Sequence, residues 1–355
     1  MKASPRLPAS PSRLKRLVRA MRGRRIGVLG DVMLDRYLVG SASRLSPEAA
    51  VPVVDFEKQE DFPGGAANVA ANLAAFGARV SLFGVLGEDT AAAELRRCLA
   101  ERELGDKGVL VDASRPTTVK QRIIAQHQQI VRVDRESRAP LDKEIEERLI
   151  RHVKSALANL DALIVSDYDK GVVTDAVAAR ILEVANQKGV RSFVKPKISL
   201  QFSYRGATAI VCNRKETEFF VSRALADAEA MEQAGRALVA HFGCAGAVIT
   251  LGRQGMAVFD ETHAKPLHIP ATSFEVTYAR VGQPGLTRGI AGRQVFDVTG
   301  AVDTVISVLA LAASAGATLR DAAWLANLSA GVVVGKLGTA TVSADELLAA
   351  IAEMP

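Results

Sequence analysis

The stretch FDVTGAVDTVISVLALAA, residues 296–313, joins a short apolar segment to a turn of small residues and then to a long apolar run. This order predicts a strand end, a tight turn and a buried helix. A helix that begins at 300–303 presents unpaired backbone N–H groups and the positive end of its dipole, and small residues let an anion approach them. Asp303 in this turn is interpreted either as an acid that caps the helix, or as a general base. The base would take a proton from a hydroxyl that attacks a phosphoryl group.

Buried strand patterns alternate with helix patterns over most of the chain. RIGVLGDVMLD (25–35), DALIVSDY (161–168) and TAIVCNRKETE (208–218) each show an apolar strand pattern that ends in polar residues. This alternation predicts an α/β fold with a mostly parallel sheet covered by helices on both faces. Segments about 34–60 and 114–135 break the alternation with paired strand patterns, which predicts a small separate sheet such as a lid.

The composition is that of an ordinary globular protein. The 355 residues are 48% apolar and 24% charged, and no apolar run reaches the roughly 18 residues that a membrane helix needs. The basic start of the chain lacks the apolar core of a signal peptide. Cys98, Cys212 and Cys244 have neither disulfide nor zinc spacing. We therefore expect a protein of the reducing cytoplasm with no membrane partner.

Much of the net charge of +6 lies near the start of the chain. Residues 1–24 are interpreted as a basic extension, solvated and partly helical, ahead of a single domain at 25–355. A nucleic-acid contact through the extension is the weaker alternative because only 5% of the residues are aromatic, so stacking platforms are scarce. We expect no nucleic-acid partner. A basic balance also suits substrates that are phosphate anions.

Two common phosphate-binding motifs are excluded by their spacing. GVLGD (27–31) lacks the third glycine of the dinucleotide fingerprint. GVVVGKLG (331–338) has no Ser or Thr after its lysine, so it is not a P-loop.

Five motifs occur in the order typical of the ribokinase-like, phosphofructokinase B-type carbohydrate kinases, and the chain from about 25 to 350 resembles that family. The motifs are GDVMLD (30–35), PGGAANVA (63–70), NRKE (213–216), TLGRQG (250–255) and DVTGAVD (297–303). Within the family, RPTTVKQRIIA (115–125) and SDYDKG (166–171) are similar to kinases of the ADP-heptose pathway. Those kinases phosphorylate the anomeric hydroxyl of D-glycero-D-manno-heptose 7-phosphate. The resemblance implies a ribokinase-like three-layer α/β/α fold with a small β-sheet lid.

The resemblance also implies a role for each matching residue. Asp303 matches the catalytic base, and the backbone N–H groups of Gly300, Ala301 and Val302 match the anion hole. The residues implied to hold the sugar phosphate are Asp35, Gly64, Gly65, Asn68, Lys120, Arg122, Asp167 and Lys170. The residues implied on the nucleotide side are Asn213, Glu216, Thr250, Gly252, Gly255 and Asn327. Of the first set, Lys120 and Arg122 are candidates for the sugar's 7-phosphate, because a doubly charged phosphate favours Lys and Arg donors.

The implied cofactors are ATP and Mg²⁺. The metal is expected to bind through ATP and to meet Glu216 through water rather than directly. A monovalent cation is a further candidate. Relatives often pair through the lid sheet, so a homodimer is the implied assembly.

Three positions and one segment depart from the family pattern. Val302 stands in place of a glycine of Gly-Ala-Gly-Asp, Asp169 in place of a glycine, and Lys195 in place of an aspartate on the nucleotide side. Val302 fits if its φ is negative and is a misfit if φ is positive; in either case its branched side chain is expected to crowd the γ-phosphate. Residues 273–293 resemble an inserted hairpin.

These departures leave three functions open. The first is the heptose 7-phosphate kinase, the second a kinase of the same fold for another sugar, and the third an impaired descendant that binds a sugar phosphate or nucleotide. Some of these kinases carry a second, nucleotidyl-transferring domain marked by Gly-x-Phe-Asp and His-x-Gly-His. That signature does not occur in this sequence, so a stand-alone kinase is expected.

Overall fold

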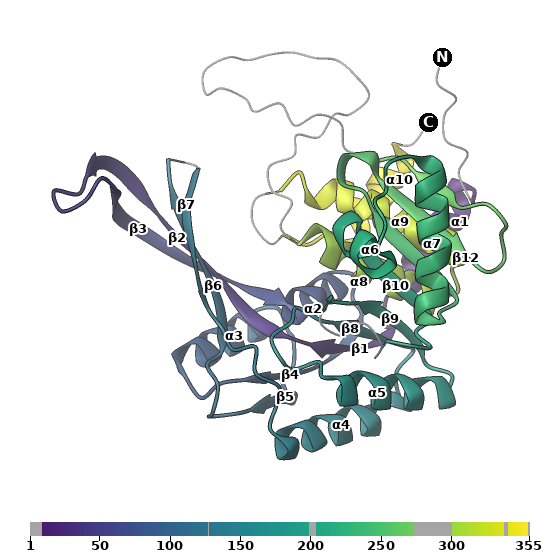
Figure 1. Ribbon diagram of the computed structural model, residues 1–355, viewed down its shortest axis with the longest axis horizontal. Helices are drawn as coiled ribbons and strands as arrows, with labels where there is room; N and C mark the ends of the chain where they lie inside the picture. The colour runs from purple at the N-terminus through teal and green to yellow at the C-terminus, as the bar shows by residue number, and fades with distance from the viewer. Residues whose placement is uncertain (1–8, 127, 199–203, 273–299, 337–339, 354–355) are drawn as a thin grey trace, which may run out of the picture.

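The structure is a computed structural model, and it describes residues 9–126, 128–198, 204–272, 300–336 and 340–353. Its larger sheet, sheet A, forms the body of the molecule (Figure 1). The strands of sheet A are β1 (Arg25–Gly30), β4 (Arg79–Leu86), β5 (Gly108–Val111), β8 (Ala162–Ser166), β9 (Arg191–Lys195), β10 (Ala209–Asn213), β11 (Gly246–Thr250), β12 (Met256–Asp260) and β13 (Leu267–Ile269). Their order is β13-β12-β11-β10-β9-β8-β1-β4-β5. All neighbours pair in parallel except at β12 and β13, which are antiparallel.

Helices cover both faces of sheet A. One face carries α1 (Pro11–Ala20), α2 (Ala66–Ala75), α3 (Thr90–Ala100), α8 (Ala301–Ser314), α9 (Leu319–Val333) and α10 (Ala344–Ala352). The other carries α4 (Lys143–Leu157), α5 (Asp175–Gln187), α6 (Arg214–Val221) and α7 (Ala228–Phe242). A 3₁₀ turn, η1 (Gly252–Gln254), joins β11 to β12.

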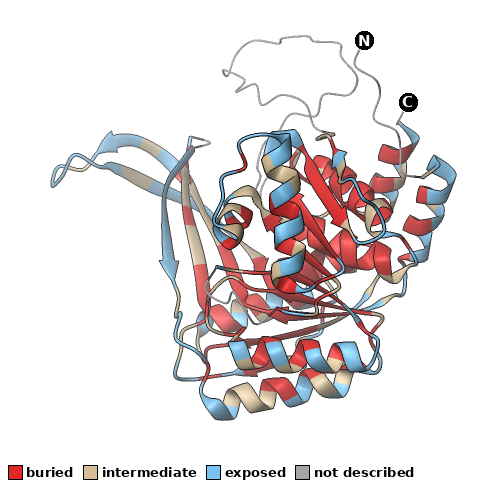
Figure 2. Cartoon of the chain, turned by 45° about the vertical axis from the view of Figure 1, so that its right-hand side comes forward, coloured by how far each residue is buried: buried red, intermediate tan, exposed pale blue. Residues whose placement is uncertain are grey.

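The central strands divide their side chains between two hydrophobic cores. In β8, Ala162 and Ile164 pack in the core under α2 and α8, whereas Leu163 and Val165 pack in the core under α4 and α5. Successive side chains of a strand point to opposite faces, so a strand covered on both sides must be apolar throughout. Figure 2 shows this as a buried centre with exposed outer helix faces. The predicted three-layer fold with a mostly parallel sheet is confirmed.

A second, four-stranded sheet, sheet B, projects from the body and is called the lid below (Figure 1). Its order is β3-β2-β6-β7, with β2 (Val32–Leu45), β3 (Pro52–Gly65), β6 (Thr118–Ala125) and β7 (Gln128–Arg135). β2 continues directly from the end of β1, and β3 leads directly into α2. The lid is therefore rooted at the carboxyl end of sheet A, and the predicted small separate sheet is confirmed.

The basic start of the chain is attached to the body from residue 11 onward. Leu14, Leu17 and Val18 of α1 are buried in the core beside α8 and α10. Arg13 donates to Asp321 of α9 at 3.0 Å. The segment predicted as a solvated extension thus contains a helix with a buried apolar face and an exposed basic one.

Three further expectations concern the cysteines, membrane-spanning helices and the inserted hairpin. Cys98, Cys212 and Cys244 are buried free thiols. In the part of the chain that the structure describes, no helix is both long and apolar enough to cross a membrane. The hairpin predicted at 273–293 lies outside the described residues.

Asp169, where related chains have glycine, adopts the left-handed conformation with φ +60°. This conformation is sterically costly for L-residues, less so for Asn and Asp than for the others, and it costs glycine nothing. We expect Asp169→Gly to raise the free energy of unfolding by about 0.5 kcal/mol, measured by urea denaturation. Glu88→Gly is the control, because Glu88 is exposed and outside the left-handed region; it should lower stability by about 0.5 kcal/mol. Equal losses in both variants would contradict the argument.

Candidate active site

A pocket of about 240 Å³ lies where the carboxyl edge of sheet A, the lid and the start of α8 meet. Two carboxylates and four cationic side chains are among the groups that line it. The lining residues are Met33, Asp35, Gly65, Lys120, Arg122, Arg132, Tyr168, Lys195, Gly300, Val302 and Asp303. Seven of these, namely Asp35, Gly65, Lys120, Arg122, Gly300, Val302 and Asp303, are residues that the sequence predicted. The excess of cations favours an anionic ligand.

Asp303 lies in the first turn of α8 at the floor of this pocket, and it is only 5% exposed. Its Oδ2 accepts from Asn68 Nδ2 at 2.9 Å. Its Oδ1 accepts from Lys195 Nζ at 2.8 Å and from the Tyr168 hydroxyl. A buried carboxylate is costly unless it is paired and hydrogen-bonded, and these three donors meet that requirement. The side chain does not cap its own helix, because α8 has no side-chain cap.

The start of α8 suits an anion site. Gly300, at the N-cap, has φ +80°, a conformation that glycine adopts without strain. Val302 lies in the helix and outside the left-handed region, so the conformational misfit considered for it does not arise. Its side chain lines the pocket and packs partly on the core. Val302 therefore acts on this site through its volume and not through its backbone.

Asn68 is placed behind Asp303 rather than in the pocket lining. It is 2% exposed, and its amide belongs to a buried network between α2 and α8. Asn72 Nδ2 donates to the Asn68 carbonyl at 2.9 Å, and the Thr304 hydroxyl donates to Asn72 Oδ1 at 2.8 Å. The Ser307 hydroxyl donates to the Asp303 carbonyl at 2.6 Å. This network fixes the position of α8 relative to α2 and so the orientation of the Asp303 carboxylate.

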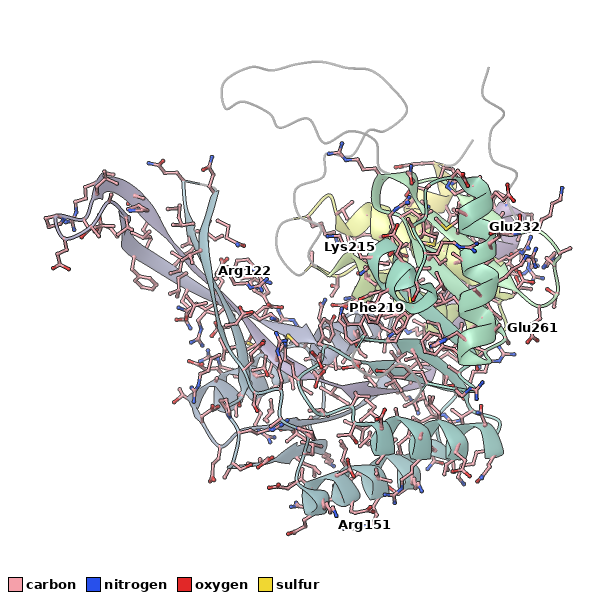
Figure 3. The ribbon with its side chains drawn as sticks, viewed as in Figure 1. Arg122, Arg151, Lys215, Phe219, Glu232 and Glu261 are labelled. Carbon is pink, nitrogen blue, oxygen red and sulfur yellow. The ribbon has the colours of Figure 1, made fainter. Side chains whose placement is uncertain are left out.

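The lid brings two cations over the pocket. Arg122 Nη1 donates to Asp35 Oδ1 at 2.6 Å, and Arg122 extends from the lid toward the body (Figure 3). Burial raises the pKa of Asp35 above its ordinary value, and the charge of Arg122 opposes that shift. Lys120 Nζ lies 3.1 Å from Asp134 and 3.6 Å from Glu136. Both cations are thus held by carboxylates and point into the pocket.

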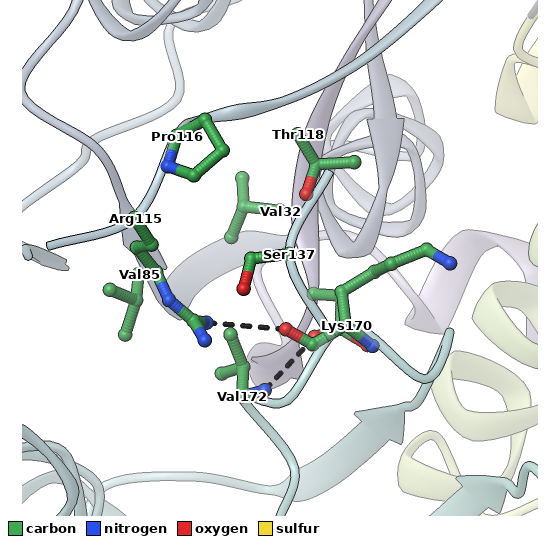
Figure 4. A pocket seen from close by; sticks show the side chains of 9 residues that line it. Val32, Val85, Arg115, Pro116, Thr118, Ser137, Lys170 and Val172 are labelled. Carbon is green, nitrogen blue, oxygen red and sulfur yellow. Dashed lines mark hydrogen bonds between the residues drawn. The ribbon is translucent and has the colours of Figure 1, made fainter. Parts of the chain in front are cut away.

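Asp167 and Lys170, predicted on the substrate side, lie behind the pocket. Asp167 is 1% exposed and accepts from the Tyr204 hydroxyl and, at 2.7 Å, from the Asp169 N–H. Lys170 Nζ lies 2.9 Å from Glu136. Lys170 also lines a smaller cavity of about 10 Å³, where Arg115 Nη1 donates to its carbonyl (Figure 4).

Asp31 holds the turn that follows β8. Its carboxylate accepts from the backbone N–H groups of Tyr168, Lys170 and Val172 at 2.7, 3.3 and 3.2 Å. Burial, and after it the charge of Asp167, raises the pKa of Asp31 to about 7. Burial raises the pKa of Asp167 as well. These two carboxyls therefore set the backbone that presents Tyr168 to the pocket.

Asn213 and Glu216 form a capping box at the start of α6 and do not line the pocket. Asn213 Oδ1 accepts from the Glu216 N–H, and Glu216 Oε2 accepts from the Asn213 N–H, both at 2.9 Å. Glu216 Oε1 lies 2.7 Å from Lys197 Nζ. Both predicted side chains lie at the carboxyl end of β10, as expected, but each is engaged in local structure.

The four remaining nucleotide-side candidates surround the turn between β11 and β12. Thr250 ends β11, and Gly252 and Gly255 have φ +59° and +84°. A side chain at Gly255 would collide with the backbone of Ile269. Asn327 Nδ2 donates to the carbonyl of Pro270 at 2.9 Å. These residues are brought together beside α9, apart from the pocket lining.

Tyr168, Met33 and Arg132 line the pocket but are not among the residues that the sequence predicted. Lys195 was expected on the nucleotide side. The structure places Lys195 against Asp303 instead. The available signal for Tyr168 was its position between Asp167 and Lys170, directly after a buried strand. That position does not show whether Asp167, Tyr168 or Lys170 faces the pocket, because side chains in a turn do not alternate between two faces as they do in a strand.

Comparison with known proteins finds a matching family and curated relatives. The pattern of the pfkB family carbohydrate kinases matches residues 24–346. The chain is 40% identical over 324 residues to the bifunctional protein HldE of Citrifermentans bemidjiense, and this match covers 91% of the chain and 62% of the relative. The chain thus spans less than two thirds of that relative's length.

Two solved structures share the fold at low sequence identity. Arabidopsis thaliana ribokinase complexed with ribose and ATP matches with a TM-score of 0.68 and 17% identity, covering 93% of this chain and 99% of that one. Phosphofructokinase-2 from Escherichia coli in complex with potassium matches with a TM-score of 0.70 and 16% identity, covering 93% and 98%. At this identity they establish the fold alone.

The raised pKa of Asp31 predicts a stability that falls as pH rises. Between the unfolded value of 3.8 and the folded value of about 7, the folded state binds a proton that the unfolded state releases. Asp167→Asn removes one cause of that shift and supplies an uncharged partner. We expect the variant to lose less stability than the parent between pH 5 and pH 8, by about 1 kcal/mol, in urea titrations.

Asp161→Asn is the matched control for this measurement. Asp161 directly precedes β8 and bonds to Arg25, the first residue of β1. Burial alone would raise its pKa, but the hydrogen bonds with Arg25 outweigh burial and lower the pKa, so its titration falls below this pH interval. The control should keep the parent's loss of stability between pH 5 and pH 8. A slope unchanged in Asp167→Asn would contradict the effect of the Asp167 charge on the pKa of Asp31.

Proposed function

The chain belongs to the pfkB family of carbohydrate kinases, and from this premise we propose that it transfers the γ-phosphoryl group of ATP to the anomeric hydroxyl of a heptose 7-phosphate. One observation carries the proposal. The buried Asp303 carboxylate, at the start of α8, shares one pocket with Lys120 and Arg122 of the lid. The likeness of residues 115–125 and 166–171 to kinases of the ADP-heptose pathway supports heptose as the sugar. The second reading is a kinase of this fold for a different sugar phosphate.

The reaction needs a base and an anion site, and both are at the start of α8. The acceptor hydroxyl gives its proton to the Asp303 carboxylate as its oxygen attacks the γ-phosphorus. The bond from that phosphorus to the bridging oxygen breaks, and ADP leaves with the electron pair. The backbone N–H groups of residues 300–302 stabilise the negative charge on the transferred group.

The lid cations suit the other end of the substrate. Lys120 and Arg122 lie on neighbouring positions of one face of β6, so both can donate to the same phosphate. Their present partners are carboxylates, which a phosphate dianion can replace. A lid closed over the sugar would also exclude water and so limit hydrolysis of ATP.

Mg²⁺ would enter with the ATP phosphates and would supply charge neutralisation there. Glu216 suits contact with Mg²⁺ through the waters of the ion rather than direct coordination, because its oxygens already pair with the Asn213 N–H and with Lys197. Within the described residues there is no group of three His, Cys, Asp or Glu side chains that could hold a metal. A requirement for a monovalent cation is a separate proposal, tested by exchanging K⁺ for a bulky organic cation in the assay.

A second function is a protein that binds the same ligands without turnover. The Lys195 ammonium, 2.8 Å from Asp303, favours this second function because the ion pair engages the carboxylate that would act as the base. The volume of Val302 in the pocket favours it too. The turnover experiment below separates the two functions.

We expect ADP formation from ATP and D-glycero-D-manno-heptose 7-phosphate, with turnover lowered about 10²- to 10⁴-fold in Asp303→Asn through loss of the general base. Val302→Gly should change turnover less than about tenfold, because the backbone at 302 is already helical and no reacting group is altered. A coupled ADP assay measures both variants beside the parent chain.

Other outcomes assign the second function or another sugar. An inert parent chain with an active Val302→Gly variant would show a site blocked by one side chain. If both are inert while the sugar phosphate still raises the melting temperature, the chain is a binding protein. Activity with other sugar phosphates and none with the heptose would change the substrate and keep the kinase.

We further propose that two copies pair through the lid. Large apolar side chains are exposed there, and an exposed apolar patch on a projecting sheet favours association. The exposed large apolar residues of the lid are Leu45 (66% exposed), Val51, Phe56 (65%), Ile130, Val131 and Val133.

Phe56→Glu is expected to shift the chain from dimer to monomer at micromolar concentration, because a charge cannot be buried at an apolar interface without a partner. Sedimentation velocity measures the change. Phe219→Glu is the control: Phe219 is 46% exposed but lies on α6, far from the lid (Figure 3). A monomeric parent chain, or equal effects of both variants, would refute pairing through the lid.

A further inference from the structure

Lys195 is the last residue of β9, and its side chain is only 9% exposed. Its Nζ lies 2.8 Å from Asp303 Oδ1, 2.7 Å from the Tyr168 hydroxyl oxygen and 3.9 Å from the centre of the Tyr168 ring. An ammonium is costly to bury unless an anion and hydrogen-bond acceptors surround it. In this structure the carboxylate of the proposed base is that anion.

The ion pair affects what Asp303 can do. Its two oxygens already accept from Asn68, Tyr168 and Lys195. A general base must turn a free lone pair toward the hydroxyl that it deprotonates. Of the three donors, the Asn68 amide lies in the buried network of α2 and α8, and the Tyr168 phenol is carried by the turn that Asp31 holds. Lys195 instead has a flexible four-carbon stem. Lys195 is therefore the donor that can leave without a rearrangement of the backbone.

A place for the ammonium to go lies within the same pocket. Lys195, Gly300 and Val302 line it together, so the ammonium and the start of α8 face one space. An acceptor oxygen within about 3 Å of Asp303 would lie about 3–3.5 Å from the phosphorus that it attacks. A phosphoryl oxygen there is reachable by an ammonium that starts 2.8 Å from the same carboxylate.

We propose that Lys195 exchanges anions during the reaction. It pairs with Asp303 in the free protein and moves to the γ-phosphoryl group of bound ATP, which frees a lone pair of Asp303 for the acceptor hydroxyl. Lys195 forms no covalent bond and transfers no proton; the hydroxyl proton goes to Asp303 and the leaving group is ADP. This role rests on the proposed kinase function and makes Lys195 a residue that contacts the substrate and positions the base.

A double-mutant cycle on binding tests this exchange without relying on turnover. The affinity of the β,γ-imido analogue of ATP, with Mg²⁺, is measured by calorimetry for the parent chain, Lys195→Met, Asp303→Asn and the double variant. Loss of a charge-assisted contact to the phosphoryl should weaken binding about tenfold or more. Removing Lys195 also exposes the Asp303 charge to the ligand, so the decisive comparison is made in the Asp303→Asn background.

In that background we expect the double variant to bind the analogue at least about tenfold more weakly than Asp303→Asn. ADP, which lacks the γ-phosphoryl group, should bind both equally. Lys154→Met, on the distant helix α4, should leave the affinity of both ligands unchanged. Melting temperatures of all variants verify folding, and Lys195→Gln replaces Lys195→Met if the latter does not fold.

Equal binding of the analogue by Asp303→Asn and the double variant would overturn the proposal, because Lys195 would then act only as a partner of Asp303. Equal weakening for ADP and the analogue would overturn it too, because the contact would not be with the γ-phosphoryl group. A parent chain that binds neither nucleotide would refute the proposed kinase function and this inference with it. Sugar-phosphate turnover with an unaltered cycle would refute the inference alone.

Discussion

Burial of the parallel strands on both faces is the constraint from which the site follows. Each central strand of sheet A has apolar cores above and below it, so its polar side chains can lie only at its ends. Parallel pairing brings the carboxyl ends of neighbouring strands to one edge. That edge collects the residues with charge or hydrogen-bonding capacity, namely Asp31, Asp167, Lys195, Asn213 and Thr250.

Asp31, Asp167 and Lys195 are buried, as is Glu216 shortly after β10, and so each of them must find a partner. Asp31 takes three backbone N–H groups, Asp167 takes a phenol and a backbone N–H, and Glu216 takes a backbone N–H and an ammonium. These bonds order the irregular turn after β8 and the start of α6 directly after β10. The pocket is the place where the remaining charged groups, Asp303 and Asp35, are paired with flexible cations instead of fixed backbone.

Local patterns were enough to predict the sheet, the lid and much of the pocket. The continuous apolar run of β8 and the motifs around Asp303 and Arg122 depend on residues that are near in sequence or share a strand face. The contact of Lys195 with Asp303 joins residues that are 108 positions apart, and no local pattern specifies it. Asn68 shows the same limit: its motif indicated a substrate contact, whereas its position under α8 gives it Asp303 as a partner. The conformation at Val302 depends on where α8 begins, which the sequence located only to within a few residues.

Two ion pairs, Asp35 with Arg122 and Asp303 with Lys195, line one pocket. An ion pair in a site of low exposure gains little net free energy, because the cost of desolvation offsets the attraction. A ligand that offers each cation a phosphate in place of a carboxylate keeps the cation paired, and the released carboxylate can then accept a hydrogen bond from a hydroxyl group of the ligand. Under the proposed kinase function, the same exchange would release both carboxylates toward the acceptor sugar, Asp35 near the lid and Asp303 at the start of α8. Under the proposed function the sugar phosphate brings one of these phosphates and ATP brings the other, so both carboxylates are released only when both substrates are bound.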